Sequence, residues 1–269
     1  MDTKGKLPMK ILVFVKQVPE TDVIRLDPKT GTLNRDRFPS IMNPYDAHAV
    51  ETALQLREAH GGAVHVITMG PDQAKAVLKE ALAMGCDEAY LLSDRAFGGA
   101  DSLATGYTLA KAAEKIGGCD LLLFGKCAVD AETAQTGPIV AELLDLSQVT
   151  LVDCVTYQDG WAVCRRDLGT QLQTVKVKLP ALLAVTRQIN RPRYPRPARI
   201  RMIHSFPLTV WSATDLDCDP TRIGISGSPS RTRRVFEPEQ RKMDPHYFTG
   251  TPDAVARAIA DVLESEHIL

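Results

Sequence analysis

The sequence predicts an α/β fold in which a parallel sheet carries helices on both faces. Over the first 145 residues, four short apolar runs rich in strand-forming residues alternate with helix-period segments. That alternation is typical of repeated strand–helix units. The runs are apolar throughout, as expected for strands that are buried on both sides. A chain of 269 residues with 44% hydrophobic residues is large enough to bury such a sheet.

The expected elements follow one another in a regular order. Helices are expected at 45–60, after Pro71, from Asp101-Ser102 onward and at roughly 132–145, because proline and aspartate suit the first positions of a helix. Each helix lies between or after two expected strands, which favours parallel crossovers. The four strands are expected at 10–16, 63–69, 89–92 and 120–124.

The second half of the chain has a different pattern. Gly160 and Gly169 separate strand-like segments, which suggests hairpins added to the sheet. Residues 190–245 are rich in Pro, Arg, Ser and Gly, so we expect them to lie along another surface. A helix capped by Thr251 with Pro252 in its first turn is expected at 251–266, and it either clamps a partner subunit or packs on its own domain. The added strands are expected at 148–157, 161–167, 172–178 and 181–186.

These patterns divide the chain into an α/β domain at 1–187 and an extended arm with a C-terminal helix at 188–269.

The composition of the chain excludes several classes of function. Its 32 Lys and Arg residues balance 33 Asp and Glu residues, which argues against nucleic-acid or anionic-membrane binding, even with an arginine run around Tyr194. No run of about 18 apolar residues predicts a membrane span. The start has no signal-peptide pattern, so a cytoplasmic protein is expected. Six scattered cysteines without a C-x-x-C pair predict reduced thiols and no metal site.

The loop after the fourth strand is the strongest candidate for a ligand site. Gly125 ends that strand, and ligands of open parallel sheets bind at the carboxyl ends of strands. Short polar side chains follow, and the amides at the start of the next helix favour phosphate. The residue types alone leave ligand binding and an ordinary polar loop both open. The sequence has no G-x-x-x-x-G-K-[ST] loop, and Gly98-Gly99-Ala100-Asp101 is not a G-x-G-x-x-G motif.

Residues 125–138 resemble the adenine-nucleotide loop of electron transfer flavoprotein beta subunits, which usually reads G-[KR]-Q-A-I-D-G-D-T-x-Q-V-G-P. The chain departs from it at Cys127, Ala131 and Glu132. Further stretches resemble the family in the same order, at 11–19, 42–46, 69–71 and 164–186. The resemblance implies an adenine-nucleotide-binding, doubly wound domain of the HUP-like type.

The resemblance also implies a heterodimer. In this family the alpha subunit holds a redox-active FAD, and the beta subunit holds AMP or a second FAD. The second FAD belongs to electron-bifurcating members and to the nitrogen-fixation-linked Fix-type branch, which residues 93–105, 210–215 and 227–230 resemble. We therefore expect FAD here, with NAD(H) as a transient substrate. Electrons would pass from NADH to a dehydrogenase and to ferredoxin or flavodoxin, and NADH:flavin oxidoreductase activity is expected only in the heterodimer.

The same resemblance implies the cofactor-binding residues and no catalytic residue. Asp101 and Ser102 could instead serve only as a helix cap, Phe14 and Met69 could belong to the core, and Cys127 could be a small filler. The implied residues are Phe14, Asn43, Pro44, Tyr45, Asp46, Met69, Asp101, Ser102, Thr105, Gly125, Lys126, Cys127, Ala128, Val129, Asp130, Ala131, Glu132, Thr133, Ala134, Gln135 and Thr136.

Three alternatives affect the partners. Residues 190–197 resemble the loop with which the family recognises its dehydrogenases, but Pro197 stands where a leucine anchor is usual. The chain could also be an AMP-binding beta subunit serving an acyl-CoA-type dehydrogenase. The third alternative is a stand-alone adenine-nucleotide-binding module of the universal-stress type.

Overall fold

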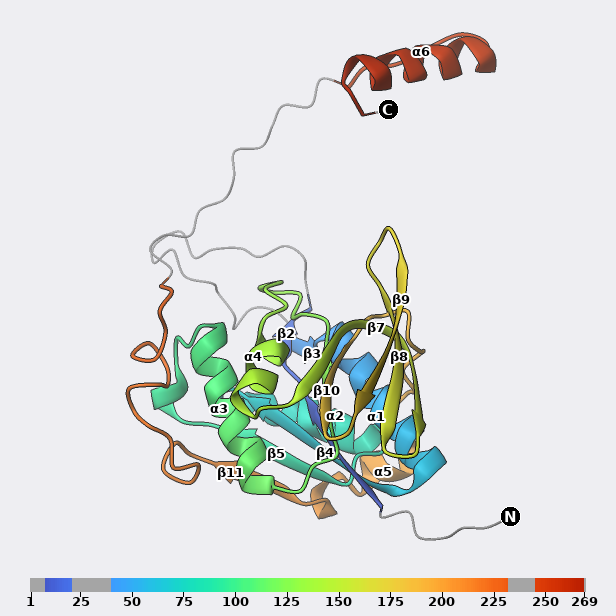
Figure 1. The fold of residues 1–269 in the computed structure, drawn as a ribbon. Helices are drawn as coiled ribbons and strands as arrows, with labels where there is room; N and C mark the ends of the chain where they lie inside the picture. Colours follow the sequence, from blue (N-terminus) through green and yellow to red (C-terminus); the bar gives the residue numbers. More distant parts are fainter. Residues whose placement is uncertain (1–7, 21–39, 232–244, 269) are drawn as a thin grey trace, which may run out of the picture. The chain divides into compact units, whose positions relative to one another are not determined.

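The computed structural model describes residues 8–20, 40–231 and 245–268 (Figure 1). The chain forms two compact units, Met1–Arg233 and Arg234–Leu269. The sequence pattern predicts an earlier boundary, after residue 187. Residues 188–231 therefore belong to the α/β unit in this structure.

The first unit is built on a sheet in the order β11-β5-β4-β1-β6-β10-β7-β8-β9. Its central strands are parallel and match the four expected apolar runs. They are β1 (Met9–Phe14), β4 (Gly62–Met69), β5 (Glu88–Leu92) and β6 (Leu121–Gly125). A separate antiparallel pair, β2 (Gln17–Pro19) and β3 (Ser40–Met42), follows β1. The α/β expectation is confirmed.

Helices cover both faces of the sheet (Figure 1). Successive side chains of β1 point to opposite faces, so Ile11 and Val13 join one buried cluster and Leu12 and Phe14 join the other. The first cluster lies under α1 (Pro44–His60) and α2 (Lys75–Met84), which the short helix η2 (Asp72–Ala74) precedes. The second lies under α3 (Ser102–Ile116) and α4 (Thr136–Leu143), with η3 (Arg95–Phe97) before α3. The central strands of the sheet are therefore a buried middle layer.

The added strands form one side of the sheet. Strands β7 (Ser147–Gln158), β8 (Trp161–Asp167) and β9 (Leu172–Lys178) are antiparallel neighbours, as expected for hairpins. Strand β10 (Ala181–Val185) is not paired with β9. It lies between β6 and β7 and runs parallel to both, which explains why all five of its residues are buried.

Regular structure does not end after residue 187, contrary to the sequence expectation. Residues beyond it form α5 (Pro197–Arg201), η4 (Ile203–Ser205) and β11 (Leu208–Trp211). Strand β11 pairs in parallel with β5, and the residues after it bury Leu216 and Ile223 in the second cluster. The segment lacks periodic apolar residues because it is stabilised by contacts with a sheet already formed. The remainder of the expected arm, 232–244, lies outside the described residues.

The second unit contains α6 (Pro252–Ser265). The Thr251 side chain accepts a hydrogen bond from the amide of Ala254, which confirms the predicted N-cap. No residue of α6 is buried, and Ile259 and Val262 are exposed. Among the described residues of the whole chain, none of the helices combines the length and apolar character that a membrane crossing requires.

Candidate functional site

The order of the strands creates a topological switch point beside β1. From β1 the chain moves outward to β4 and β5, and it then returns to place β6 on the other side of β1. The chain therefore leaves β1 toward one side of the sheet and leaves β6 toward the other. Open α/β sheets bind their ligands at such a topological switch point. The segments that leave the carboxyl ends of β1 and β6 lie at this switch point. They begin at Val15 and at Lys126.

The loop from β6 to α4 is held at its start and exposed in its middle. The amide of Lys126 donates to the carbonyl of Val185, and the amide of Glu132 donates to the carbonyl of Ala128. Residues 131–135 are exposed. Glu132 and Ala134 have φ angles of 50° and 54°, in a left-handed region that is costly for residues with a Cβ and is often found at functional sites.

These two residues also explain where α4 starts. A helix was expected from about residue 132, but left-handed residues cannot continue a right-handed helix, so α4 begins at Thr136. Its N-cap residue, Gln135, makes no side-chain cap hydrogen bond. The first amides of a helix have no partner within it, so the start of α4 offers donors to an anion.

The beginning of α1 fixes the loop. Asn43 is fully buried; its amide nitrogen donates to the carbonyl of Cys127 at 2.9 Å, and its Oδ1 accepts from the amide of Val129 at 3.2 Å. Asp46 accepts from the amides of Lys16 at 2.8 Å and Gly125 at 3.2 Å. The two side chains thus join β1, α1 and the loop. They fix the backbone at the start of the loop and are therefore positioning residues.

Asp46 is confined by its neighbours. Burial raises the pKa of its carboxyl to about 7, although hydrogen bonds from Asn43, Lys16 and Gly125 oppose this shift. A Cβ on Gly125 would lie 2.4 Å from Oδ1 of Asp46 and 2.6 Å from Cβ of Tyr45. Gly125 is therefore needed because the α1 residues approach its backbone closely. The guanidinium of Arg187 covers the ring of Tyr45, with 4.5 Å between Cζ and the ring centroid.

Lys16 lies at the candidate site, and no sequence pattern indicated it. It follows Val15, the first residue after β1, and its Nζ lies 2.7 Å from both carboxylate oxygens of Asp130. This ion pair connects the segment after β1 with the loop after β6. Its position after the first strand was available from the sequence, but no local pattern indicated that its side chain crosses to residue 130.

The start of α3 reaches the same loop. Ser102 Oγ lies 3.3 Å from Thr133 Oγ1. Asp101 is the N-cap of α3, and it accepts from the amides of Leu103 and Ala104. Its second oxygen accepts from the amide and hydroxyl of Ser230. Partial burial acts to raise the pKa of Asp101, but the hydrogen bonds from Ser230, Ala104 and Leu103 outweigh it and the pKa is lowered. The capping alternative for Asp101 therefore has direct structural support.

A cavity of about 370 Å³ lies at the carboxyl ends of β4 and β5. Met69, Leu92 and Phe97 give it apolar walls, and Ser93, Asp94 and Arg95 are among its polar lining. Phe14, at the end of β1, is buried. Its ring stacks on that of Phe124, with ring centroids 4.3 Å apart and planes inclined by 9°. Phe14 therefore belongs to the core, whereas Met69 lines a cavity.

The structure thus brings most of the expected residues to one edge. Residues 43–46, 125–136 and 102 are joined by the contacts above, and Met69 lies at the end of the strand beside β1. Thr105 lies one turn into α3, where its amide donates to the carbonyl of Asp101. Burial raises the pKa of the Cys127 thiol, which favours the filler alternative, because the thiolate is the reactive form.

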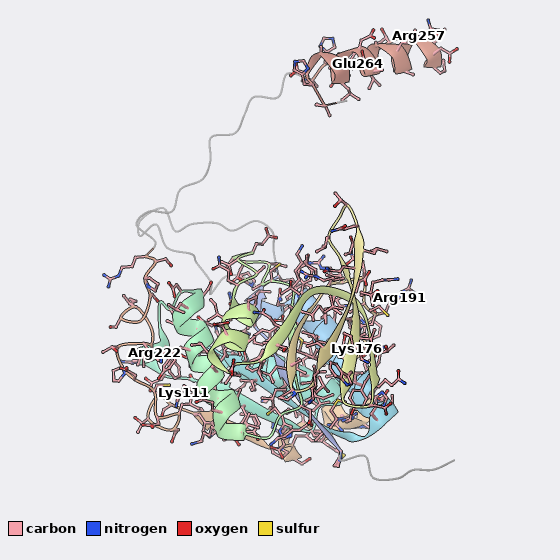
Figure 2. The ribbon with its side chains drawn as sticks, in the orientation of Figure 1. Lys111, Lys176, Arg191, Arg222, Arg257 and Glu264 are labelled. Carbon is pink, nitrogen blue, oxygen red and sulfur yellow. The ribbon has the colours of Figure 1, made fainter. Side chains whose placement is uncertain are left out.

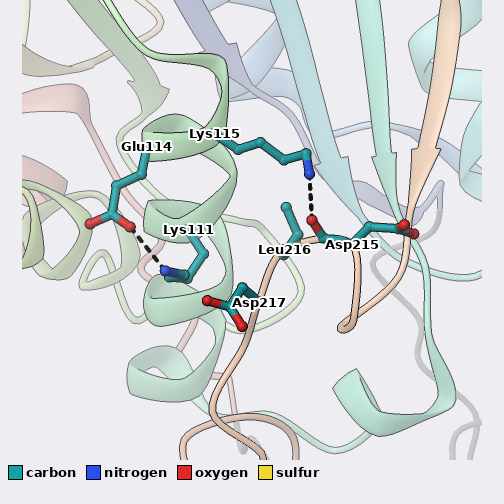
Figure 3. Close-up of a pocket in the computed structure, with 6 residues that line it drawn as sticks. All are labelled: Lys111, Glu114, Lys115, Asp215, Leu216 and Asp217. Atoms are coloured by element: carbon teal, nitrogen blue, oxygen red, sulfur yellow. Dashed lines mark hydrogen bonds and ion pairs between the residues drawn. The ribbon is translucent and has the colours of Figure 1, made fainter.

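A second, smaller cavity of about 290 Å³ lies beside α3 and has a different character (Figure 3). Lys115 Nζ donates to the carbonyl of Asp215 at 2.5 Å, and Lys111 pairs with Glu114 at 3.3 Å. The Lys115–Asp215 contact ties the segment after β11 to α3, and the Lys111–Glu114 pair lies within α3. Figure 2 shows Lys111 and Arg222 on this side of the first unit, with Lys176 and Arg191 on the opposite side. None of the expected cofactor residues lines this cavity.

Fold and site together define a class: α/β proteins with an open, mostly parallel sheet and a candidate ligand loop at its switch point. Comparison with known proteins makes this specific. The electron transfer flavoprotein domain matches residues 30–211. The chain therefore belongs to the electron transfer flavoprotein family.

Individual relatives point to the beta subunits of this family. The chain is 42% identical to subunit CarD of the caffeyl-CoA reductase-Etf complex of Acetobacterium woodii, over 97% of this chain and 100% of that protein. It is also 42% identical to an electron transfer flavoprotein subunit beta of Thermoanaerobacterium thermosaccharolyticum, with the same coverage. Protein FixA of Azorhizobium caulinodans is 41% identical over 87% of this chain and 86% of its own length.

Proposed function

We propose that this chain is the FAD-binding beta subunit of a heterodimeric electron transfer flavoprotein of the bifurcating type. It would act with an alpha subunit, in the cytoplasm, and pass electrons from NADH to a dehydrogenase and to ferredoxin or flavodoxin. The observation that carries the proposal is the switch-point edge, where Asn43 and Asp46 hold a strained, exposed loop in front of an uncapped helix. The similarity to CarD and FixA supports the bifurcating type.

The residues at this edge fit a flavin adenine dinucleotide in their chemistry. The phosphates of the ligand need donors and positive charge, which the first amides of α4 and the ammonium of Lys16 can supply. Its ring systems need apolar walls, and the cavity beside Met69, Leu92 and Phe97 provides them. The hydroxyl groups of Ser102 and Thr133 contact each other at the surface of the loop and can bind ribose or ribityl oxygens.

The contribution of the protein is to bind and orient. When bound, FAD supplies the electron-transfer chemistry, and the chain supplies its place and surroundings. Asn43 and Asp46 set the path of the loop, and α3 presents its N-terminus, whose positive end favours negative charge nearby. The segment 228–230 keeps that N-terminus in place through Asp101 and the Ser228 hydroxyl.

Cofactor analysis of the purified protein tests this function. The full-length chain is expected to copurify with an alpha subunit and to carry two FAD per heterodimer after extraction and chromatography. One FAD together with one AMP would instead support the AMP-binding alternative. A homodimer that binds ATP and no flavin would contradict the proposal altogether and favour the stand-alone module.

The FAD content of an Asn43→Ala variant tests the location of the site without a measurement of electron transfer. Loss of the buried amide removes both contacts to the loop, so we expect about one FAD per heterodimer instead of two. Unchanged FAD content in a folded variant would show that the second flavin is held elsewhere.

A further inference from the structure

The Lys16–Asp130 ion pair lies at the switch point of the sheet, where open α/β sheets bind their ligands. Lys16 follows β1 and Asp130 lies in the loop after β6, the two strands that form the switch point. Both carboxylate oxygens of Asp130 are 2.7 Å from the lysine Nζ. The pair therefore connects the segment after β1 with the loop after β6.

The main chain of Lys16 is held firmly while its head group is accessible. Its amide donates to Asp46 at 2.8 Å, and its carbonyl accepts from the amide of Asn43 at 2.8 Å. The side chain is 45% exposed and that of Asp130 is 18% exposed. An ion pair with this exposure contributes little net stability. A stronger anion can therefore displace Asp130 without disturbing the backbone that carries Lys16.

We propose that Lys16 is a phosphate-binding residue and that its pair with Asp130 is a latch that a pyrophosphate group opens. The proposal rests on the proposed nucleotide function of this edge. A pyrophosphate carries more negative charge than one carboxylate, and an ammonium binds phosphate as a compact point charge. The uncapped start of α4 supplies further donors just beyond the loop. Asp130 competes for the same ammonium, so the latch selects ligands with several phosphate charges.

The latch makes two variants of one ion pair act in opposite directions. Lys16→Met removes the cation but keeps its stem, and we expect it to weaken FAD and ADP binding about tenfold. Asp130→Asn keeps the size of the side chain but removes the competing charge, so the same ligands should bind about threefold more tightly. Adenosine, which has no phosphate, should bind both variants within about twofold of the unmodified protein.

Isothermal titration calorimetry of the full-length protein, stripped of bound nucleotide, measures these affinities. FAD, ADP and adenosine are the probes. Lys178→Met is a matched control, because it removes one exposed positive charge at the end of β9, several strands away from the switch point. It should leave all three affinities unchanged. Thermal unfolding of each variant checks that it is folded.

The outcomes separate the latch from the function on which it rests. If the unmodified protein binds none of the three probes, the nucleotide function and the latch both fail. If it binds FAD and both variants weaken binding equally, the pair is a structural clasp and the latch alone is overturned. Weaker adenosine binding by Asp130→Asn would also overturn it, because Asp130 would then contact the nucleoside.

Discussion

Two irregular segments of the first unit are held by the same helix, but in different ways. The first turn of α1 holds the loop 125–136 through Asn43 and Asp46, which contact only the first residues of that loop. The middle of α1 holds the segment 187–201 through Glu51 and Thr52. All four of these α1-side residues are buried polar groups.

The second segment is held along most of its length. Asn190 bonds to His48 and Thr52, and Arg193 pairs with Glu51 and Glu58. Farther along, the amide of Arg196 donates to the carbonyl of Ala83, and Arg199 donates to the carbonyl of Leu82 at 2.7 Å. A segment held along its length is attached to the helices throughout, whereas a loop held at its start keeps its later polar groups available.

Arg193→Met should have the largest effect on stability. It should disrupt the attachment of the second segment, 187–201, and leave the loop 125–136 in place. Glu51 is only 4% exposed, so loss of its partner leaves a buried charge uncompensated. We expect the free energy of unfolding to fall by about 3 kcal/mol in urea denaturation. Arg191→Met, an exposed neighbour, should change it by less than about 0.5 kcal/mol. Equal effects of the two variants would contradict the rigid attachment.

Asn43→Ala and Asn190→Ala make the same chemical change in the two segments. Each leaves buried backbone or hydroxyl groups without a partner, so each should cost about 1–3 kcal/mol of stability. Only Asn43→Ala should also weaken nucleotide binding, because it alone releases the loop. Titration calorimetry with FAD measures the difference. If Asn190→Ala weakened binding as much, the two segments would not be independent.

Asp46 gives the loop attachment a pH dependence. Its pKa is raised from 3.8 to about 7 in the folded protein, so the folded state retains a proton that the unfolded state releases. This contribution to stability is complete below pH 3.8 and is lost as the pH rises to about 7. Urea denaturation should therefore show about 1–2 kcal/mol less stability at pH 8 than at pH 5.5 from this group. Asp46→Asn should abolish that share of the difference, and an unchanged pH profile would contradict the assignment.

Glu132→Gly should have the smallest effect and the opposite sign. Glycine accepts the positive φ of residue 132 without steric cost, which gains somewhat more than the added flexibility of the unfolded chain loses. We expect a net gain of about 0.5 kcal/mol in thermal unfolding. Glu142→Gly, inside α4, should instead lose about 0.5–1 kcal/mol. A loss from Glu132→Gly would mean that its side chain makes stabilising contacts.

Much of the fold could be predicted from the sequence because its signals are local. Apolar runs marked the central strands, and Asp101 and Thr251 marked helix starts by their capping chemistry. The placement of β10 and β11 could not be predicted in this way. Residues 208–211 are only four strand-forming residues after a proline, and their partner β5 lies more than a hundred residues earlier.

The site was predictable to a similar extent. Family resemblance located the loop and the start of α1, and the structure joined them. The resemblance could not show that Asn43 and Asp46 are buried behind the loop, or that Phe14 stacks in the core. These features depend on the direction of the side chains. Lys16 was missed because its partner Asp130 is distant in the sequence and the two meet only when β1 and β6 are neighbours.

The late position of β11 has a consequence for synthesis on the ribosome. Until residue 211 has emerged, the outer edge of β5 lacks its neighbour, and the surfaces that Trp211 and Leu216 later cover stay exposed to solvent. An unpaired strand edge is a template for pairing with other chains, and such non-local contacts form slowly. A nascent chain of this protein therefore carries an aggregation-prone edge for more than a hundred residues of translation, during which chaperone binding to β5 would be most useful.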